Sequence, residues 1–119
     1  MAASSRGEAG RRAEELAALF LAARGLAVVE RNFRCRRGEI DIIARDGETL
    51  VFVEVRLRSR SDFGDAAASI TAAKRARIAA AAAYYLARLP RTPPCRVDAL
   101  LFADLDSGRI EWLRNIMDV

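Results

Sequence analysis

Two apolar runs with carboxylates inside them, residues 38–44 (GEIDIIA) and 51–56 (VFVEVR), most constrain how this chain folds. Each run has the β-branched character of a buried strand, yet carries Asp41 or Glu54, and a charge buried without a partner costs several kcal/mol. Asp46-Gly47 between them is a strong hairpin signal, which predicts two neighbouring antiparallel strands. We therefore expect Asp41 and Glu54 to lie within reach of each other.

Alternation of side chains predicts which residues share a face with these carboxylates. Glu39 and Asp41 should lie on one face of the first strand, and Glu54 and Arg56 on one face of the second. Two adjacent carboxylates repel each other unless a cation lies between them. Mg²⁺, or Mn²⁺ in its place, is such a cation and prefers oxygen ligands. The alternative is a simple ion pair of Asp41, Glu54 and Arg56 on a solvated face, which predicts no metal affinity.

The remaining pattern predicts five further elements around this hairpin. They are a helix over residues 11–23 ended by Gly25, a strand over 26–33, a second helix from Ser69 or Thr71 to Leu89, and closing strands over 95–103 and 109–114. A basic turn is expected over residues 34–38 and a mobile loop over 57–65. The order αβββαββ indicates an α/β fold with a mixed sheet and a helix on each face.

Composition narrows the function classes. With 119 residues the chain forms one domain, 1–119, whose residues 1–9 we expect to be flexible. It contains no histidine, which excludes Cys-His and Ser-His nucleophiles and histidine-based zinc sites, and Cys35 and Cys95 are expected to be free. The longest apolar run, residues 78–83, cannot span a bilayer and no secretion signal is evident, so a cytoplasmic protein without membrane contact is expected.

The net charge of +4 favours a polyanionic partner. The chain has 19 arginines and one lysine, Lys74. Arginine suits bidentate phosphate contacts, but an alanine-rich chain with so little lysine is better explained by a bias toward GC-rich codons. The position of the basic residues is more informative than their number, because they cluster on both sides of the acidic strands.

Several spaced motifs in one order resemble the YraN family of small bacterial proteins. The resemblance covers nearly the whole chain and rests on Gly10-x-x-x-Glu14, Arg31-Asn32, Gly38-Glu39-Ile40-Asp41-x-Ile43-x-x-Asp46-Gly47, Val51-Phe52-Val53-Glu54-Val55-Arg56-x-Arg58, Phe63-Gly64, Ile70-Thr71-x-x-Lys74, Cys95-Arg96-Val97-Asp98 and Ile110-Glu111-Trp112. That family is itself similar to Holliday-junction resolvases and other PD-(D/E)xK nucleases. The resemblance implies a restriction-endonuclease-like fold.

The resemblance also implies roles for single residues. Asp41 resembles the first metal-ligand aspartate and Glu54 the acid of the (D/E)xK element, with the carbonyl of Val55 as a further ligand. Glu14 resembles the acidic residue supplied by the first helix. Periodicity cannot choose between Glu14 and Glu15, because this helix is apolar nearly all round, and only the spacing from Gly10 selects Glu14. The alternative for Glu14 is a charge on the helix surface.

Arg56 stands where the nuclease pattern has lysine. Arginine remains charged and cannot act as a general base, but its fork can hold the scissile phosphate. Lys74 could partly compensate: a cation in the first turn of a helix opposes the helix dipole, which indicates an acidic or phosphate partner. The alternative for Lys74 is a surface lysine that extends into solvent.

We therefore expect a magnesium-dependent endonuclease acting on DNA, including branched or otherwise structured DNA. Its catalytic residues would be Asp41, Glu54, Arg56 and Lys74. A non-catalytic nucleic-acid-binding protein on the same fold is the alternative, and resolvase-like cutting of a symmetric junction would suit a homodimer. Further phosphate contacts are expected from the remaining basic residues, namely Arg34, Arg36, Arg37, Arg58, Arg60, Arg75 and Arg77.

Overall fold

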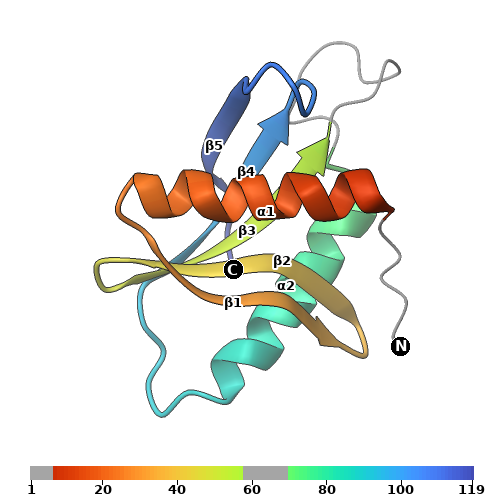
Figure 1. Ribbon diagram of the computed structural model, residues 1–119. Helices are drawn as coiled ribbons and strands as arrows, with labels where there is room; N and C mark the ends of the chain where they lie inside the picture. Colours follow the sequence, from red (N-terminus) through yellow and green to blue (C-terminus); the bar gives the residue numbers. More distant parts are fainter. Residues whose placement is uncertain (1–6, 58–69) are drawn as a thin grey trace.

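The computed structural model describes residues 7–57 and 70–119. Arg58, Arg60, Ser69 and most of the predicted loop lie outside the described residues, as does most of the N-terminal stretch expected to be flexible. The elements are α1 (Glu8–Ala23), β1 (Ala27–Cys35), β2 (Gly38–Asp46), β3 (Thr49–Leu57), α2 (Ala72–Ala87), β4 (Cys95–Phe102) and β5 (Ile110–Met117). This order is the predicted αβββαββ arrangement (Figure 1).

The strands form one mixed sheet in the order β1-β2-β3-β4-β5. β3 and β4 are parallel and are joined through α2, while the other three neighbouring pairs are antiparallel. The β2–β3 hairpin turns at Gly47, whose φ of 62° favours glycine, with Asp46 opposite Thr49. The α/β class and the hairpin predicted from the Asp-Gly pair are both confirmed, and the architecture is consistent with a restriction-endonuclease-like fold.

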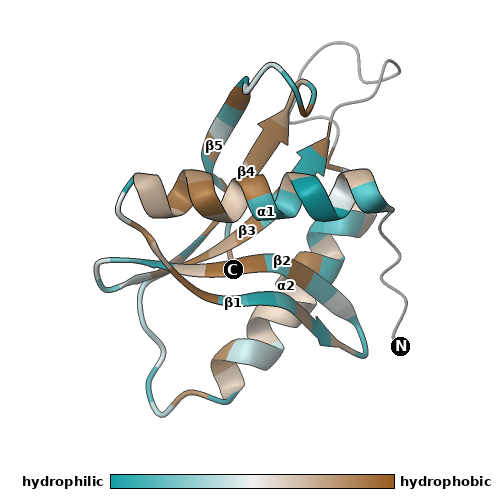
Figure 2. Cartoon of the chain, in the orientation of Figure 1, coloured by the Kyte–Doolittle hydropathy of each residue, from teal (hydrophilic) through white to brown (hydrophobic). Residues whose placement is uncertain are grey.

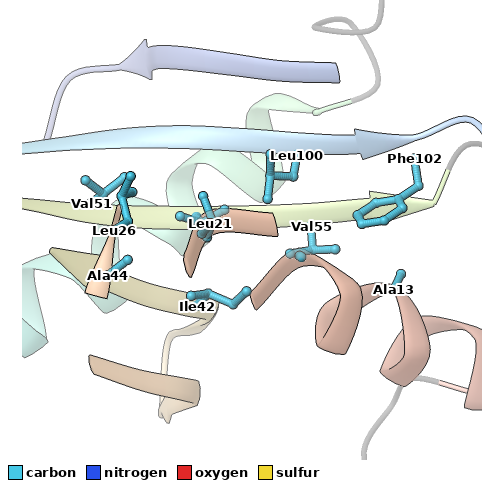
Figure 3. Close-up of a cluster of buried hydrophobic side chains, with 11 residues drawn as sticks. Ala13, Leu21, Leu26, Ile42, Ala44, Val51, Val55, Leu100 and Phe102 are labelled. Atoms are coloured by element: carbon cyan, nitrogen blue, oxygen red, sulfur yellow. The ribbon is translucent and has the colours of Figure 1, made fainter. Parts of the chain in front are cut away.

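α1 covers one face of the sheet. Its buried residues Ala13, Ala17 and Leu21 pack against strand residues in one apolar cluster (Figure 3). The strand residues of this cluster are Ile42, Ala44, Val51, Val53, Val55, Leu100 and Phe102. The N-terminal half of α1 is hydrophilic and its C-terminal half hydrophobic, so most of the apolar contact comes from the later turns (Figure 2).

α2 covers the opposite face. Ile78, Ala81, Ala82 and Tyr85 pack there with Phe52. The small alanine side chains let the helix lie close to the strands, as the alanine-rich segment predicted. The predicted alternation holds in β3, whose Val51, Val53 and Val55 belong to the cluster under α1. In β2, Ile40 departs from strict alternation, because it packs with Ile43 on the α2 side although it was expected on the other face.

Element boundaries follow local capping chemistry. α1 begins at Glu8, three residues before the expected start, and ends before Gly25, whose φ is 89°. Thr71 is the N-cap of α2, and its hydroxyl oxygen accepts a hydrogen bond of 3.2 Å from the backbone N–H of Lys74. This cap fixes where the first turn of α2 begins, and with it the position of Lys74.

A fully buried carboxylate, Asp98 of β4, anchors the last strand. It accepts hydrogen bonds from the Trp112 indole N–H at 3.0 Å and the Asn115 backbone N–H at 2.8 Å, both on β5. The Arg96 guanidinium supplies a third partner at 3.1 Å. Burial alone would lower the pKa of Arg96, but its hydrogen bond to Asp46 and the charge of Asp98 outweigh burial and raise it. A buried charge is thus matched by donors that hold β5 on the sheet.

Candidate metal and phosphate site

Asp41 and Glu54 lie beside each other on neighbouring strands. The β2–β3 ladder runs from Asp46 opposite Thr49 to Ile42 opposite Val53, and the next residue of each strand, Asp41 and Glu54, lines the same small cavity. Their exposed fractions are 1% and 5%. The solvated face of the alternative is therefore wrong, because these carboxylates are buried. An ion pair itself is present, but it joins Glu54 to Lys74 and not to Arg56.

A backbone hydrogen bond fixes the Asp41 side chain. The N–H of Val55 donates to Oδ2 of Asp41 at 2.8 Å. Where the regular pairing of β2 with β3 ends, a backbone N–H of β3 is thus hydrogen-bonded to the Asp41 side chain. This contact also holds Asp41 next to the Val55 peptide, whose carbonyl was predicted as a further metal ligand and stays a prediction.

Glu54 is paired with Lys74. The Lys74 Nζ lies 2.7 Å from Glu54 Oε2, and the lysine side chain is 38% exposed. The partner of Glu54 is therefore the lysine of α2, whereas the sequence had grouped Glu54 with Arg56. The position of Lys74 in the first turn of the helix predicted an acidic or a phosphate partner, and the acidic partner is present. The alternative, a lysine that extends into solvent, is wrong.

A small cavity of about 30 Å³ joins these groups. Its described lining consists of Glu39, Asp41, Glu54, Lys74, Arg77 and Ile78. We call it the carboxylate cavity. Its volume corresponds to about one water molecule or one small ion. Three carboxylates and two cations line it, so its formal charge of −1 leaves a preference for a further cation.

Glu14 is buried on the α1 side and is not among the residues that line the carboxylate cavity. Its Oε1 accepts a hydrogen bond of 2.7 Å from the Asn32 amide and lies 3.5 Å from the Arg31 guanidinium. Glu15 is exposed, so the structure selects Glu14 as the inward residue of the pair and excludes a surface charge. Its role as a metal ligand stays a prediction.

Asn32 holds the Glu14 side chain by a hydrogen bond, a role that the sequence left unassigned. It sits in β1 with φ of 55°, a conformation that asparagine tolerates better than most residues. In this position its amide reaches Glu14 on α1. Arg31-Asn32 was visible as a motif, but nothing in strand periodicity signals a left-handed residue within a strand.

The predicted phosphate-binding arginines divide into three groups. Arg34, Arg36, Arg37 and Arg77 line one hollow at the β1–β2 turn. Arg75 instead donates to the backbone carbonyls of Ile70 and Ile116, at 3.2 and 2.8 Å, and so ties α2 to β5. Arg58 and Arg60 lie outside the described residues. Nucleic-acid contact by any of them stays a prediction.

The donor chemistry fits a hard divalent ion. Asp41, Glu54 and Glu39 line the cavity and offer carboxylate oxygens, which are the ligand type of Mg²⁺ and Mn²⁺. Within residues 7–57 and 70–119, no three His, Cys, Asp or Glu side chains are already arranged around one point as metal ligands. A bound ion would have to share Glu54 with Lys74, whose Nζ lies 2.7 Å from Glu54 Oε2.

Arg56 is half-buried and is not among the residues that line the carboxylate cavity. It lies opposite Leu101 of β4, one same-face step beyond Glu54 along β3. Its predicted contact with the scissile phosphate stays a prediction.

In the part of the chain that the structure describes, no helix is long and apolar enough to cross a membrane.

The mixed sheet and the helix on each of its faces define an α/β protein whose architecture is consistent with a restriction-endonuclease-like fold. The chain belongs to the uncharacterised protein family UPF0102, whose model matches residues 13–102. It is 53% identical over 110 residues to a UPF0102 protein of Nitrosospira multiformis, which covers 92% of each chain. It is 54% identical over 118 residues to one from Cupriavidus metallidurans, covering 98% of this chain and 86% of the relative. These matches confirm the resemblance to the bacterial YraN family.

Proposed function

We propose that this protein is a metal-dependent nuclease that hydrolyses phosphodiester bonds in DNA in the cytoplasm, with the carboxylate cavity as its active site. The observation that carries the proposal is the meeting of Asp41, Glu54 and Lys74 around one small cavity. Two buried carboxylates with a lysine at hydrogen-bond distance are the groups that PD-(D/E)xK chemistry requires. Here the lysine comes from α2 instead of from the strand.

Asp41 and Glu54 would hold the ion, with the Val55 carbonyl beside them. When bound, Mg²⁺ would stabilise negative charge on the phosphoryl oxygens and activate the attacking water. The hydrogen bond from the Val55 N–H keeps the Asp41 carboxylate aimed before any substrate arrives. This preorganisation avoids a reorientation cost at the moment of reaction.

Lys74 would position the attacking water. Its ammonium, held by Glu54, can donate a hydrogen bond to a water in the cavity and can give a proton to the leaving oxygen, which an arginine guanidinium does far less readily. The water oxygen would form a bond to phosphorus and give up a proton to the surrounding water, the ester P–O bond would break, and the leaving oxygen would take a proton from the Lys74 ammonium. Arg56 would then serve the neighbouring phosphate oxygens through its fork.

The second candidate function is nucleic-acid binding without cutting. It is favoured by one specific observation: Lys74 already neutralises Glu54, and its Nζ lies at an oxygen that an ion would otherwise use. In this alternative the pair stabilises the fold, and the arginines alone bind phosphates.

A panel of branched, single-stranded and duplex DNA separates the two functions. Purified protein is incubated with each substrate in Mg²⁺ or Mn²⁺, and cutting and binding are measured on the same samples. Metal-dependent cutting of any member supports the nuclease. Tight, salt-sensitive binding without cutting supports the binding protein, because phosphate contacts weaken steeply with salt. Binding that is insensitive to salt contradicts both.

A further inference from the structure

A second, larger hollow adjoins the carboxylate cavity. It has a volume of about 240 Å³ and is lined by Arg34, Cys35, Arg36, Arg37, Glu39 and Arg77 around Gly38. We call it the arginine hollow. Its volume is below the ~300–1,000 Å³ of sites for drug-sized ligands, so it suits a small group such as a phosphate better than a base.

The floor of the arginine hollow is a close contact between the β1–β2 turn and α2. A Cβ atom at Gly38 would lie 2.0 Å from the Arg77 carbonyl oxygen, so only glycine lets the turn approach the helix this closely. Cys35 pairs with Gly38 across the two strands, which leaves Arg36 and Arg37 as the two residues of the turn. The fold thus fixes the turn arginines opposite Arg77.

The charges of this hollow favour an anion. Four arginines and one carboxylate line it, which gives its side chains a formal charge of +3. The carboxylate, Glu39, lies 3.5 Å from the Arg34 guanidinium, so Arg34 is partly neutralised. Arg36, Arg37 and Arg77 remain to offer planar forks, the geometry that matches phosphate oxygens.

The two cavities share two residues, Glu39 and Arg77. Along β2, Glu39 precedes Asp41 by two residues, which is about 7 Å. A nucleic-acid strand advances ~3.4 Å per nucleotide along its axis, so this separation corresponds to about two nucleotide steps. A strand with one phosphate at the carboxylates would bring a nearby phosphate to the arginines.

We propose that the arginine hollow binds a second phosphate group of the substrate strand, close to the one that is cut, and so determines which bond is cut. The selection of the bond that is cut rests on the proposed function, whereas phosphate binding in the arginine hollow does not require catalysis. The phosphate can belong to a strand terminus or to an internal diester, and both offer the same chemistry to the arginines.

Cys35 provides a built-in reporter of occupancy. It lines the hollow and is half-buried, while Cys95, equally half-buried at the start of β4, does not line it. The rate of alkylation of each thiol is measured by mass spectrometry with rising inorganic phosphate at constant ionic strength and without metal. We expect phosphate to slow labelling of Cys35 but not of Cys95. Equal effects on both thiols would overturn the proposal.

Charge-matched variants show whether the arginines cause this protection. Arg36→Gln with Arg37→Gln removes the turn cations, whereas Arg45→Gln with Arg91→Gln removes two charges from a separate hollow near the other end of β2. The first pair should raise the phosphate concentration needed for half protection by about tenfold or more. The control pair should leave it unchanged. If both pairs act alike, only overall charge matters and the hollow is not a site.

Oligonucleotides distinguish the two sources of phosphate. The same labelling is repeated with single strands that carry or lack a terminal phosphate. Protection that requires the terminal phosphate assigns a phosphomonoester, and equal protection by both strands assigns an internal diester. Protection by neither strand overturns the proposal, since the hollow would then bind no strand.

The labelling experiment tests the phosphate site, and the cutting experiment tests the nuclease activity, so the two claims can be contradicted separately. If the wild-type protein cuts DNA but Cys35 is not protected, the arginine hollow is wrong and the nuclease stands. If Cys35 is protected but nothing is cut, the phosphate site stands on a binding protein. If both hold, Arg36→Gln with Arg37→Gln should also shift the positions of the cuts, and unchanged positions would overturn the role in selecting the bond.

Discussion

The Lys74 ammonium on α2 lies 2.7 Å from a carboxylate oxygen of Glu54 on β3, twenty residues earlier in the chain. Arg56, two residues after Glu54, occupies the sequence position where PD-(D/E)xK nucleases carry a lysine. The helix therefore brings to Glu54 the ammonium that the strand lacks. Thr71 fixes the position of Lys74 in the first turn of α2, because its hydroxyl oxygen caps the helix by accepting a hydrogen bond from the Lys74 backbone N–H.

Replacing Lys74 tests this pair energetically. Lys74→Met should lower the free energy of unfolding by about 1–2 kcal/mol, less than for a fully buried pair because the lysine is partly exposed. Urea denaturation measures this loss. In the double variant with Glu54→Gln the loss should largely disappear, since no buried charge is then left alone. A loss that is unchanged in the double variant would show that the two side chains are not coupled.

Lys74 should also matter for cutting. Lys74→Met should lower the single-turnover rate about 100-fold or more, because the attacking water loses the donor that positions it and the leaving oxygen loses its proton donor. The matched control is Lys74→Arg, which keeps the charge but cannot release a proton near neutral pH. Both variants should be slow. Full activity in Lys74→Arg would mean that only charge is needed.

Arg56→Lys should not raise the cutting rate. If Lys74 supplies the lysine chemistry, a second lysine on β3 is redundant and the loss of the arginine fork weakens phosphate contact. We expect the cutting rate of Arg56→Lys, measured under the same conditions, to be equal to or below that of the wild-type protein. A clear gain would show that the strand position limits catalysis, and that Lys74 is not a substitute.

The Asp98 anchor should affect stability alone. Asp98→Asn leaves the donors of Arg96, Trp112 and Asn115 poorly matched in a buried position, at a cost of about 2–4 kcal/mol. Chemical denaturation followed by Trp112 fluorescence measures this cost. Asp118→Asn, at the exposed end of the chain, is the control and should cost almost nothing. Equal stability of both variants would contradict the anchor.

Asp104 should give a small acid-dependent contribution to stability. The Ser107 backbone N–H and hydroxyl, together with the Asp106 N–H, hold the pKa of Asp104 below its usual value of 3.8. Because the folded-state pKa is the lower one, its contribution is full above the unfolded value and is lost as pH falls through the folded value. A carboxyl NMR titration should show a midpoint below 3.8. A midpoint at or above that value would contradict the turn contacts.

Much of this arrangement could be predicted from the sequence because strand and turn signals are local. Asp46-Gly47 identified the hairpin, and the hairpin register identified Asp41 and Glu54 as neighbours. The partner of Glu54 was harder to predict, since it depends on where α2 packs across the sheet. That packing is set by many small alanine contacts without a residue-specific signal.

Two features were beyond sequence reasoning for physical reasons. The left-handed Asn32 breaks the alternation of β1 and brings its amide to Glu14, a contact between elements that no periodicity encodes. The arginine hollow depends on Gly38 meeting the Arg77 backbone. A glycine before a strand is ordinary in sequence, and its need becomes clear only when the helix is placed.

The most direct test of the central claim is the cutting rate as a function of Mg²⁺ concentration for the wild-type protein and for Asp41→Asn and Glu54→Gln. Asp46→Asn, on the same strand as Asp41 but outside the carboxylate cavity, is the matched control. We predict cutting that rises with Mg²⁺, disappears with a chelator, persists in Asp46→Asn and is lost in both cavity variants. Cutting that survives in Asp41→Asn and Glu54→Gln, or none at any Mg²⁺ concentration in the wild-type protein, would contradict a metal-dependent nuclease at this site.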